Sequence, residues 1–182
     1  LSANTDVSTT GAGTVLVEAT AVDASIAMDD ESSVQSVSGD IYLKAAGASA
    51  QVVLGDITAS AANVHIGTGG RVLAAVDADA EVTALGLSIN AGSGIGLLAG
   101  NSLGAGVSAI ETTVGVLSAY AVGNDGIHIV ESDSLVLGTV RSVSDSTKSV
   151  VVSQVQTDAT VLTTSASSQS DVSNSAGNGS IV

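Results

Sequence analysis

The two histidines of the sequence, His65 and His128, are its candidates for a general base near neutral pH. Nucleophilic catalysis needs such a base beside a hydroxyl or thiol nucleophile, oriented by a third group. Each histidine is the middle residue of an aliphatic–x–aliphatic triplet, at residues 64–66 and 127–129. In a strand this spacing turns the two aliphatics to one face and the histidine to the other. We therefore expect both histidines to be exposed, distant from each other and not catalytic.

Carboxylates are plentiful, which raises the alternative of a carbohydrate-active enzyme. Such an enzyme places acids in a groove, with aromatic or basic groups that hold the sugar. Tyr42 and Tyr120 are the only aromatic residues, and the four basic residues are scattered as Lys44, Arg71, Arg141 and Lys148. We expect Tyr42 and Lys44 to be exposed and to share no site with the histidines. The sequence shows no oriented catalytic partners, so we expect no enzyme activity.

The glycine-rich stretch at residues 92–96, Gly-Ser-Gly-Ile-Gly, superficially resembles a dinucleotide-binding loop. That loop requires a good helix after it, whereas residues 97–106 are rich in glycine and hold Asn101 and Ser102. We therefore expect a turn here and no cofactor.

A dense acidic turn, Asp29-Asp30-Glu31, is the candidate for a calcium site, because calcium takes several oxygen ligands. The EF-hand spacing and the Gly-Gly-x-Gly-x-Asp repeat are both absent. A second acidic series, Asp77, Asp79 and Glu81, alternates with small apolar residues, so we expect these acids to point outward. Successive members would be about 7 Å apart, too far for one ion without other ligands. We expect solvated acids in both places, with Asp29, Asp30 and Glu31 as weak calcium candidates.

The composition excludes several classes of partner. Four basic residues face eighteen acidic ones, and the formal net charge is −14. Nucleic acids and anionic lipids bind clusters of Lys and Arg, so both are excluded as partners. Residues 82–110 carry no charge and contain a Gly96, Gly100, Gly104 series, as some membrane helices do. Because many other glycines disfavour a helix there, we expect no membrane insertion.

The apolar residues predict a narrow, regular core. Hydrophobic residues make up 45% of the 182 positions and aromatic residues 1%, with no Phe, Trp, Pro or Cys. Without large side chains, close packing requires a repeating interior. Without Cys, disulfides and thiolate zinc sites are excluded. Short strand-like triplets start at Val15, Ile41, Val64 and Ile89, at intervals of 26, 23 and 25 residues. Turn residues lie between them.

These intervals predict an all-β parallel β-helix, a β-solenoid with coils of about 25 residues. Residues 52–57 and 135–140 are similar to each other and support the period. Strand alternation predicts a shared set of inward-facing side chains: Val15, Val17, Ile41, Leu43, Leu54, Ile57, Val64, Ile66, Ile127, Ile129, Val150 and Val152.

The segment from residue 39 to residue 66 resembles the repeats of filamentous-haemagglutinin-type proteins, the giant adhesins of bacterial envelopes. The resemblance is carried by Gly-Asp-Ile-Tyr-Leu-Lys-Ala-Ala-Gly, then Val-Leu-Gly-Asp-Ile-Thr-Ala, then Ala-Asn-Val-His-Ile. It is also clear over residues 123–152. It implies a right-handed parallel β-helix, export to the cell surface or beyond, and a rod or adhesin role, and it supplies no catalytic residues.

The expected organisation is a polar linker or donated strand at residues 1–13, followed by repeats over residues 14–182. Residues 179–182, Gly-Ser-Ile-Val, read like the start of another strand. We therefore expect the repeats to continue beyond the chain or to stack on a neighbouring copy. Three functions stay open at this point: a structural or adhesive rod segment, a self-assembling extracellular fibre subunit, and a carbohydrate-active enzyme.

Overall fold

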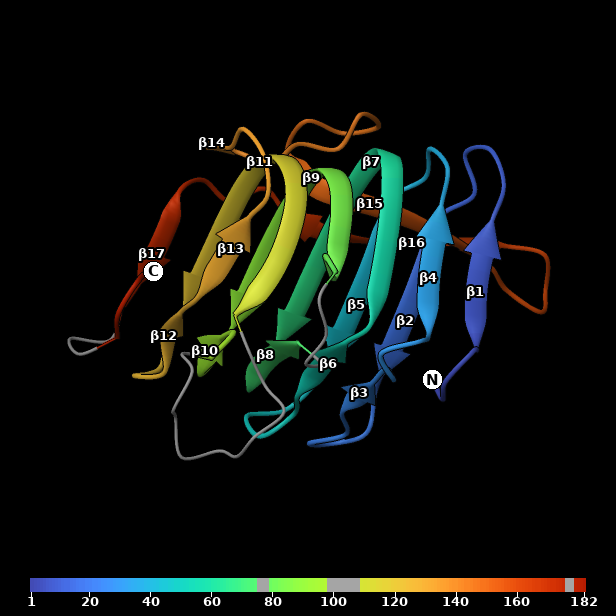
Figure 1. The fold of residues 1–182 in the computed structure, drawn as a ribbon. Coiled ribbons are helices and arrows are strands. Elements are labelled where there is room, and N and C mark those ends of the chain that lie inside the picture. Colours follow the sequence, from blue (N-terminus) through green and yellow to red (C-terminus); the bar gives the residue numbers. More distant parts are fainter. Residues whose placement is uncertain (75–78, 98–108, 176–178) are drawn as a thin grey trace.

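The computed structural model describes residues 1–74, 79–97, 109–175 and 179–182 (Figure 1). Over these ranges the chain is all-β, with no helix. No helix that could cross a membrane is therefore found among them. The all-β class predicted from the sequence is confirmed.

The largest sheet has ten strands, and its main path is parallel throughout. That path runs through β1 (Asp6–Thr9), β4 (Ser33–Ser36), β7 (Asp56–Thr68), β9 (Val82–Ala91), β11 (Ile110–Ala121) and β13 (Ile129–Glu131). Four further strands join its sides: β2 (Val15–Ala19), β5 (Ile41–Ala45), β14 (Val136–Leu137) and β17 (Val172–Asn174). The long strand β7 pairs with β4 near its start and with β5 near its end, and β11 pairs with β13, β14 and β17 along its length. Strand β9 lies between β7 and β11 (Figure 1).

A second parallel sheet of five short strands lies opposite the first (Figure 1). Its order is β12 (Gly126–Ile127), β10 (Gly94–Ile95), β8 (Arg71–Ala74), β6 (Val52–Leu54) and β3 (Ile26–Ala27). The main core contains buried aliphatic residues of both sheets. Side chains alternate between the two faces of a strand, so every second residue of each row can enter this core.

The core is built from aliphatic residues that stand in register. Val15, Ile41, Val64, Leu87 and Leu117 follow one another across β2, β5, β7, β9 and β11, and all five are buried. Each such burial contributes roughly 1.5–3 kcal/mol. Aliphatic side chains of similar size can stack at strand spacing, which is how a core without Phe or Trp can pack closely.

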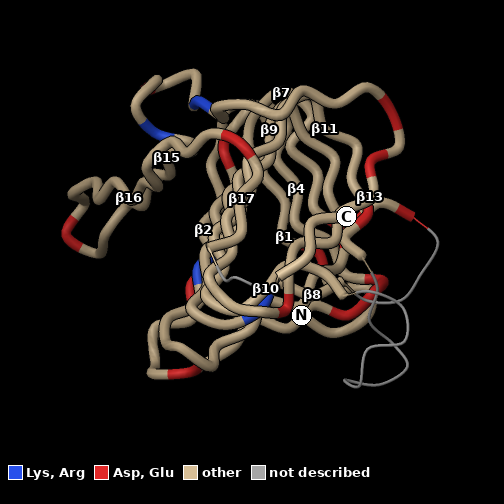
Figure 2. The backbone as a smooth tube through the Cα atoms, turned by 90° about the vertical axis from the view of Figure 1, so that its left-hand side faces the viewer, with Lys and Arg blue, Asp and Glu red and all other residues tan. Residues whose placement is uncertain are grey.

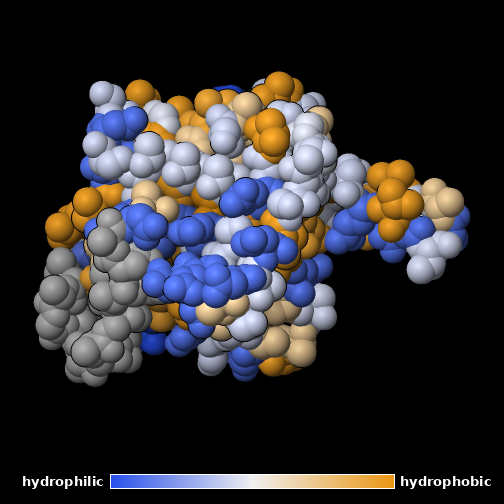
Figure 3. Space-filling model, turned by 45° about the vertical axis from the view of Figure 1, so that its right-hand side comes forward, coloured by the Kyte–Doolittle hydropathy of each residue, from blue (hydrophilic) through white to orange (hydrophobic). Residues whose placement is uncertain are grey.

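The C-terminal part of the chain forms a separate antiparallel hairpin. Strand β15 (Lys148–Val155) pairs with β16 (Val161–Ser167). Strand β15 lies against β7, β5 and β2 on the outer side of the large sheet. The hairpin then projects beyond the body, and its tip carries the exposed side chains of Val155, Val161 and Leu162 (Figure 3).

The prediction of a right-handed parallel β-helix with coils of about 25 residues is wrong. The strands are divided among three sheets, parallel and antiparallel, and these do not form a solenoid. The predicted intervals of 26 and 23 residues do recur, because Val15, Ile41 and Val64 are parallel partners in β2, β5 and β7. Ile89 pairs with Ile66 instead of Val64, and partners in β9 and β11 are 30 positions apart. The aliphatic–x–aliphatic pattern predicts a strand with one buried face, but it determines neither the partner of that strand nor its direction.

The predicted inward-facing residues are mostly buried, with two kinds of exception. Val17 and Ile129 are only partly buried against the core. Val150 and Val152 are buried, but in a separate cluster with Tyr42, because β15 belongs to the antiparallel hairpin.

The similar segments 52–57 and 135–140 do not occupy equivalent places. Residues 52–54 form β6 of the second sheet, whereas 136–137 form β14 of the first. Within the segment expected to be a linker or a donated strand, residues 6–9 form β1 and pair with β4 of the same chain.

Candidate functional site

The first candidate surface is the end of the sheets formed by β1, β2 and β3 (Figure 1). Each of these strands is paired along one side, and no strand of the described ranges pairs with the other side. The N–H of Val15 donates to the Asp40 carbonyl, and the Ala19 carbonyl accepts from Ala46. Because backbone groups alternate sides along a strand, those of Leu16 and Glu18 face the open edge. This edge can accept hydrogen bonds from, and donate them to, a further strand.

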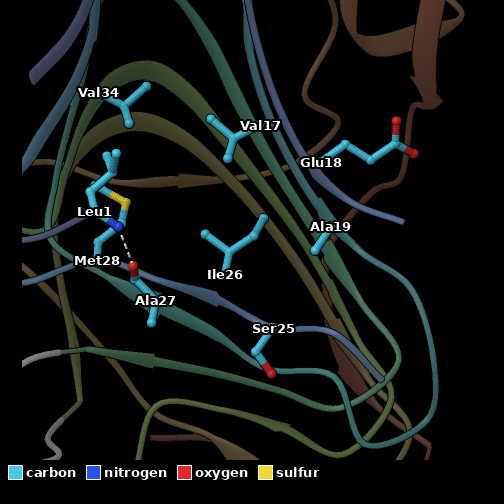
Figure 4. Close-up of a pocket in the computed structure, with 9 residues that line it drawn as sticks. All are labelled: Leu1, Val17, Glu18, Ala19, Ser25, Ile26, Ala27, Met28 and Val34. Atoms are coloured by element: carbon cyan, nitrogen blue, oxygen red, sulfur yellow. Dashed lines mark hydrogen bonds between the residues drawn. The ribbon is translucent and has the colours of Figure 1, made fainter. Parts of the chain in front are cut away.

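Behind this edge the apolar core is open. A hollow of about 450 Å³ is lined mainly by apolar side chains that point into it, among them Val17, Ile26, Met28 and Val34 (Figure 4). Leu1 lies along the outer side of β3: its amino group donates to the Ala27 carbonyl over 2.6 Å, and its carbonyl accepts from the N–H of Asp29 over 3.0 Å. The outer edge of β3 is therefore already covered by Leu1. An open apolar hollow beside an unpaired edge is the surface that another strand-bearing segment would cover.

The opposite end of the molecule has the same character. Strands β13, β14 and β17 form the outer side of the large sheet, and Ile181 continues the second sheet by a parallel bridge to Ile127. A hollow of about 180 Å³ there is lined almost entirely by apolar side chains: Leu117, Ile127, Ile129, Leu135, Leu137, Val172, Ile181 and Val182, with Glu131. The core is thus accessible at both ends.

A buried polar cluster joins the hairpin to the large sheet. The Asp40 carboxylate accepts hydrogen bonds from the backbone N–H of Asn63 (3.1 Å), the hydroxyl of Ser142 (2.6 Å) and the N–H of Val151 (2.9 Å). The Asn63 side chain donates to the carbonyls of Arg141 (2.8 Å) and Ser149 (3.1 Å). These bonds hold residues 141–151 against β5 and β7.

His65 lies within this contact, and the prediction that it is exposed is wrong. Its side chain is 5% exposed and that of Tyr42 is 8% exposed. The rings meet edge to face with centroids 5.0 Å apart, so Tyr42 and His65, predicted to share no site, lie together. Both do point away from the main core, as strand alternation predicts, but the hairpin covers them. Burial lowers the pKa of His65 to about 4.

A serine hydroxyl lies beside this histidine: Ser149 Oγ is 3.3 Å from His65 Nδ1. The pair has the residue types of a nucleophile and a base. However, Ser149 is fully buried, and an imidazole with so low a pKa is a weak base. The contact therefore serves the docking of the hairpin. In the sequence, the middle position of the triplet 64–66 predicts only that His65 points away from the core. No local pattern predicts that a segment more than eighty residues away covers it.

His128 is buried as well, contrary to the prediction. Its Nε2 lies 3.1 Å from the Asp125 carbonyl, at the end of the second sheet, and so it has different neighbours from His65. Lys44 is partly exposed, and its ammonium group is 2.6 Å from a Glu18 carboxylate oxygen, which raises the pKa of Lys44. The side-chain hydrogen bond to Glu18 is the main cause of that shift.

The calcium candidates Asp29, Asp30 and Glu31 occupy an exposed turn between β3 and β4. Glu31 accepts a hydrogen bond from the Asn4 side chain over 2.9 Å. Across the part of the chain that the structure describes, no three acidic or histidine side chains are grouped to hold a metal ion. Binding of calcium stays untested.

The second acidic series differs from its prediction. Glu81 is buried, and its carboxylate accepts from the backbone N–H of Glu111 over 2.6 Å, so it does not point into solvent.

The pKa of a neighbouring carboxyl group, that of Asp56, is raised mainly by burial, and the carboxylates of Asp79 and Asp30 add to the shift. Asp77 lies outside the described residues, as do Gly100 and Gly104 of the glycine series. In the stretch 92–96, residues 94–95 form β10.

Comparisons with family models, curated proteins and solved structures find no match to this chain, so the resemblance to haemagglutinin-type repeats stays a prediction.

Proposed function

We propose that the chain is a structural or adhesive segment of a secreted or cell-surface bacterial rod, which joins neighbouring segments end to end. The observation that supports this most directly is that, within the described residues, each end of one core has strand edges without a partner strand and an open apolar hollow. A neighbour is either another part of the same polypeptide or a second copy. No catalytic group is assigned.

The two ends are complementary in their hydrogen-bonding capacity. One end presents the outer edges of β1 and β2. The other end presents the outer edges of β13, β14 and β17, and residue 181 beside β12. Parallel strands added at either end would continue the existing sheets and cover the hollow. Contact between unlike ends is heterologous, and it generates open filaments unless the rotation closes a ring.

The charge of the chain sets the conditions for this association. The net charge is −14, and the acidic residues occupy many separate places along the backbone in Figure 2, with few basic residues among them. Copies therefore repel each other at low ionic strength. Salt screens this repulsion, with a Debye length of about 8 Å at physiological ionic strength. We expect association to increase with salt, opposite to the behaviour of a complex held by ion pairs.

The test is the molar mass of the purified chain, measured by light scattering and sedimentation over a range of concentrations and salt. We expect the mass to rise with both. Glu18→Pro removes a backbone donor from the open edge of β2, where proline is tolerated, and should lower the association. Glu18→Ala is the matched control, because it removes the same ion pair to Lys44 but keeps the N–H.

If Glu18→Pro does not fold, Ala19→Lys places a charge beside the same hollow and should also lower the association. A single monomeric species for the unaltered chain, at every concentration and salt, would overturn association between copies. Equal association of Glu18→Pro and Glu18→Ala would exclude the β2 edge as the contact.

A further inference from the structure

A polar groove separates the base of the hairpin from the outer face of the large sheet. It has a volume of about 420 Å³, within the range of small-molecule sites, and is lined by Tyr42, His65, Asn90 and residues 165–169. We infer that this groove binds a neutral, polyhydroxylated ligand, with the chemistry of a single sugar ring. The inference is independent of how the two ends of the molecule are covered.

A glycine, Gly67, lies beside Tyr42 and His65 at the edge of the groove. Gly67 stands in register between Lys44 of β5 and Asn90 of β9, on the same face of β7 as His65. A Cβ atom at Gly67 would lie 3.4 Å from His65 Nε2 and 3.7 Å from the Tyr42 hydroxyl. Because Gly67 has no side chain, space is left beside these two polar atoms, between the side chains of Lys44 and Asn90 on the neighbouring strands.

Of these two atoms, His65 Nε2 can accept a hydrogen bond and the Tyr42 hydroxyl can donate one. Ser149 Oγ donates to the Ala166 carbonyl over 3.4 Å, so its oxygen accepts from the N–H at His65 Nδ1, 3.3 Å away. A neutral imidazole protonated at Nδ1 keeps a lone pair on Nε2. Within the described residues no group hydrogen-bonds this Nε2 or the Tyr42 hydroxyl. A ligand hydroxyl can therefore donate to His65 and accept from Tyr42.

The rest of the lining fits the same chemistry. Asn90, Ser165 and Ser167 are exposed, with an amide and two hydroxyls available to further ligand hydroxyl groups. Gln169 is already held, since its amide donates to the Ile89 carbonyl over 2.7 Å. Among the described residues, no side chain that lines the groove is charged. Two lysines lie on neighbouring positions: Lys44 is paired with Glu18, and Lys148 is the strand partner of Ser167. Because the lining itself carries no charge to compensate that of an anion or a cation, the groove favours neutral ligands.

The protonation states at neutral pH agree with this assignment. Burial lowers the pKa of His65 to about 4, so the ring is neutral and its Nε2 can accept. Burial is also the main cause that raises the pKa of Tyr42, so its hydroxyl keeps the proton that it donates.

The experiment is an NMR titration of the full chain with millimolar glucose, galactose, mannose and N-acetylglucosamine, with glucuronate as the charged counterpart. The signals followed are those of the His65 ring. We expect a saturable shift of His65 with at least one neutral sugar, and weaker binding of glucuronate. Tyr42→Phe removes one hydrogen bond and should weaken binding about fivefold, the equivalent of about 1 kcal/mol.

Gly67→Ala should weaken or abolish binding, because the added methyl group would lie against His65 Nε2 and the Tyr42 hydroxyl, the two atoms that the ligand needs. Gly138→Ala is the matched control, since its methyl group would contact only Val136 and Val116 at 3.7–3.9 Å, outside the groove, and binding should be unchanged. If Gly67→Ala fails to fold, Tyr42→Phe still decides. The inference is overturned if no neutral sugar shifts the His65 signals, or if the groove variants bind as the control does.

Discussion

The buried carboxylate of Asp40 accepts a hydrogen bond of 2.6 Å from the hydroxyl of Ser142, which lies 102 residues further along the chain. The same carboxylate also accepts from the backbone N–H groups of Asn63 and Val151. One side chain at the start of β5 thereby satisfies donors from β7, from the loop before the hairpin and from β15. Asp40 is the principal polar link between the hairpin and the large sheet.

Replacing Asp40 by Ala should lower the free energy of unfolding by about 3 kcal/mol, because three buried donors lose their acceptor. Urea denaturation measures this loss. Hydrogen exchange should show the largest gain in rate within residues 141–167, where the hairpin is held. Ser142→Ala removes only one of the three donors and should cost about 1–2 kcal/mol.

Asp133→Ala is the control for the loss of a carboxylate, since Asp133 is exposed, and it should leave the stability unchanged. If Asp40→Ala were as stable as this control, the polar cluster would not hold the hairpin. If its exchange rates rose evenly over the whole chain, Asp40 would stabilise the body rather than this contact.

The sequence pattern predicts which face of a strand a side chain takes, but not which distant segment covers that face. The triplet at 64–66 correctly predicts that Val64 and Ile66 enter the core and that His65 points away from it. The same rule misjudges the exposure of His65, because the cover comes from Ser149 and its neighbours, and no periodicity encodes that pairing. Alternation fixes which face a side chain takes, but the partner of that face is a tertiary property.

The hairpin shows the same limit for topology. Val150 and Val152 repeat the pattern of the core triplets, and they are buried as predicted. They pack near Tyr42, on the outer side of the sheet, because β15 pairs antiparallel with β16. A strand with two buried valines fits a parallel sheet and an antiparallel hairpin equally well. The pattern alone therefore could not predict which of these topologies β15 adopts.

Gly92 should be intolerant of alanine, because its backbone passes very close to the neighbouring row. A Cβ atom there would overlap the carbonyl oxygen of Gly69, and one at Gly69 would overlap that of Gly47. The rows would have to separate, and we expect Gly92→Ala to cost about 2 kcal/mol in urea denaturation. Gly138→Ala, which meets only side-chain methyl groups, should stay within about 0.5 kcal/mol of the unaltered chain. Equal stability of the two variants would contradict the close approach.

Two leucines of β9 provide a matched test of the core. Leu87 is fully buried in the series that contains Val64 and Leu117, whereas Leu85, two residues earlier, is 51% exposed. Leu87→Ala should cost about 3 kcal/mol, from lost burial and the cavity that remains. Leu85→Ala should cost less than about 1 kcal/mol by the same measurement. A similar cost at both positions would mean that β9 does not turn Leu87 into a packed interior.

The stability of the chain should depend on pH through His65. Burial lowers the pKa of His65 from 6.5 to about 4 in the folded state. As the pH falls below 6.5, the unfolded chain takes up a proton on this ring and the folded chain does not. Folding therefore loses free energy between pH 6.5 and pH 4, to a total of about 3 kcal/mol, and the contribution levels off below pH 4.

His65→Gln separates this effect from the titration of the carboxylates. Between pH 7 and pH 4 the unaltered chain should lose about 3 kcal/mol more stability than the variant, because glutamine does not titrate. An NMR titration of the His65 ring in the folded chain should give a midpoint near pH 4 and none near 6.5. Parallel stability curves for the two proteins, or a ring that titrates near pH 6.5 while the chain is folded, would show that burial under the hairpin does not disfavour the charged imidazole of His65.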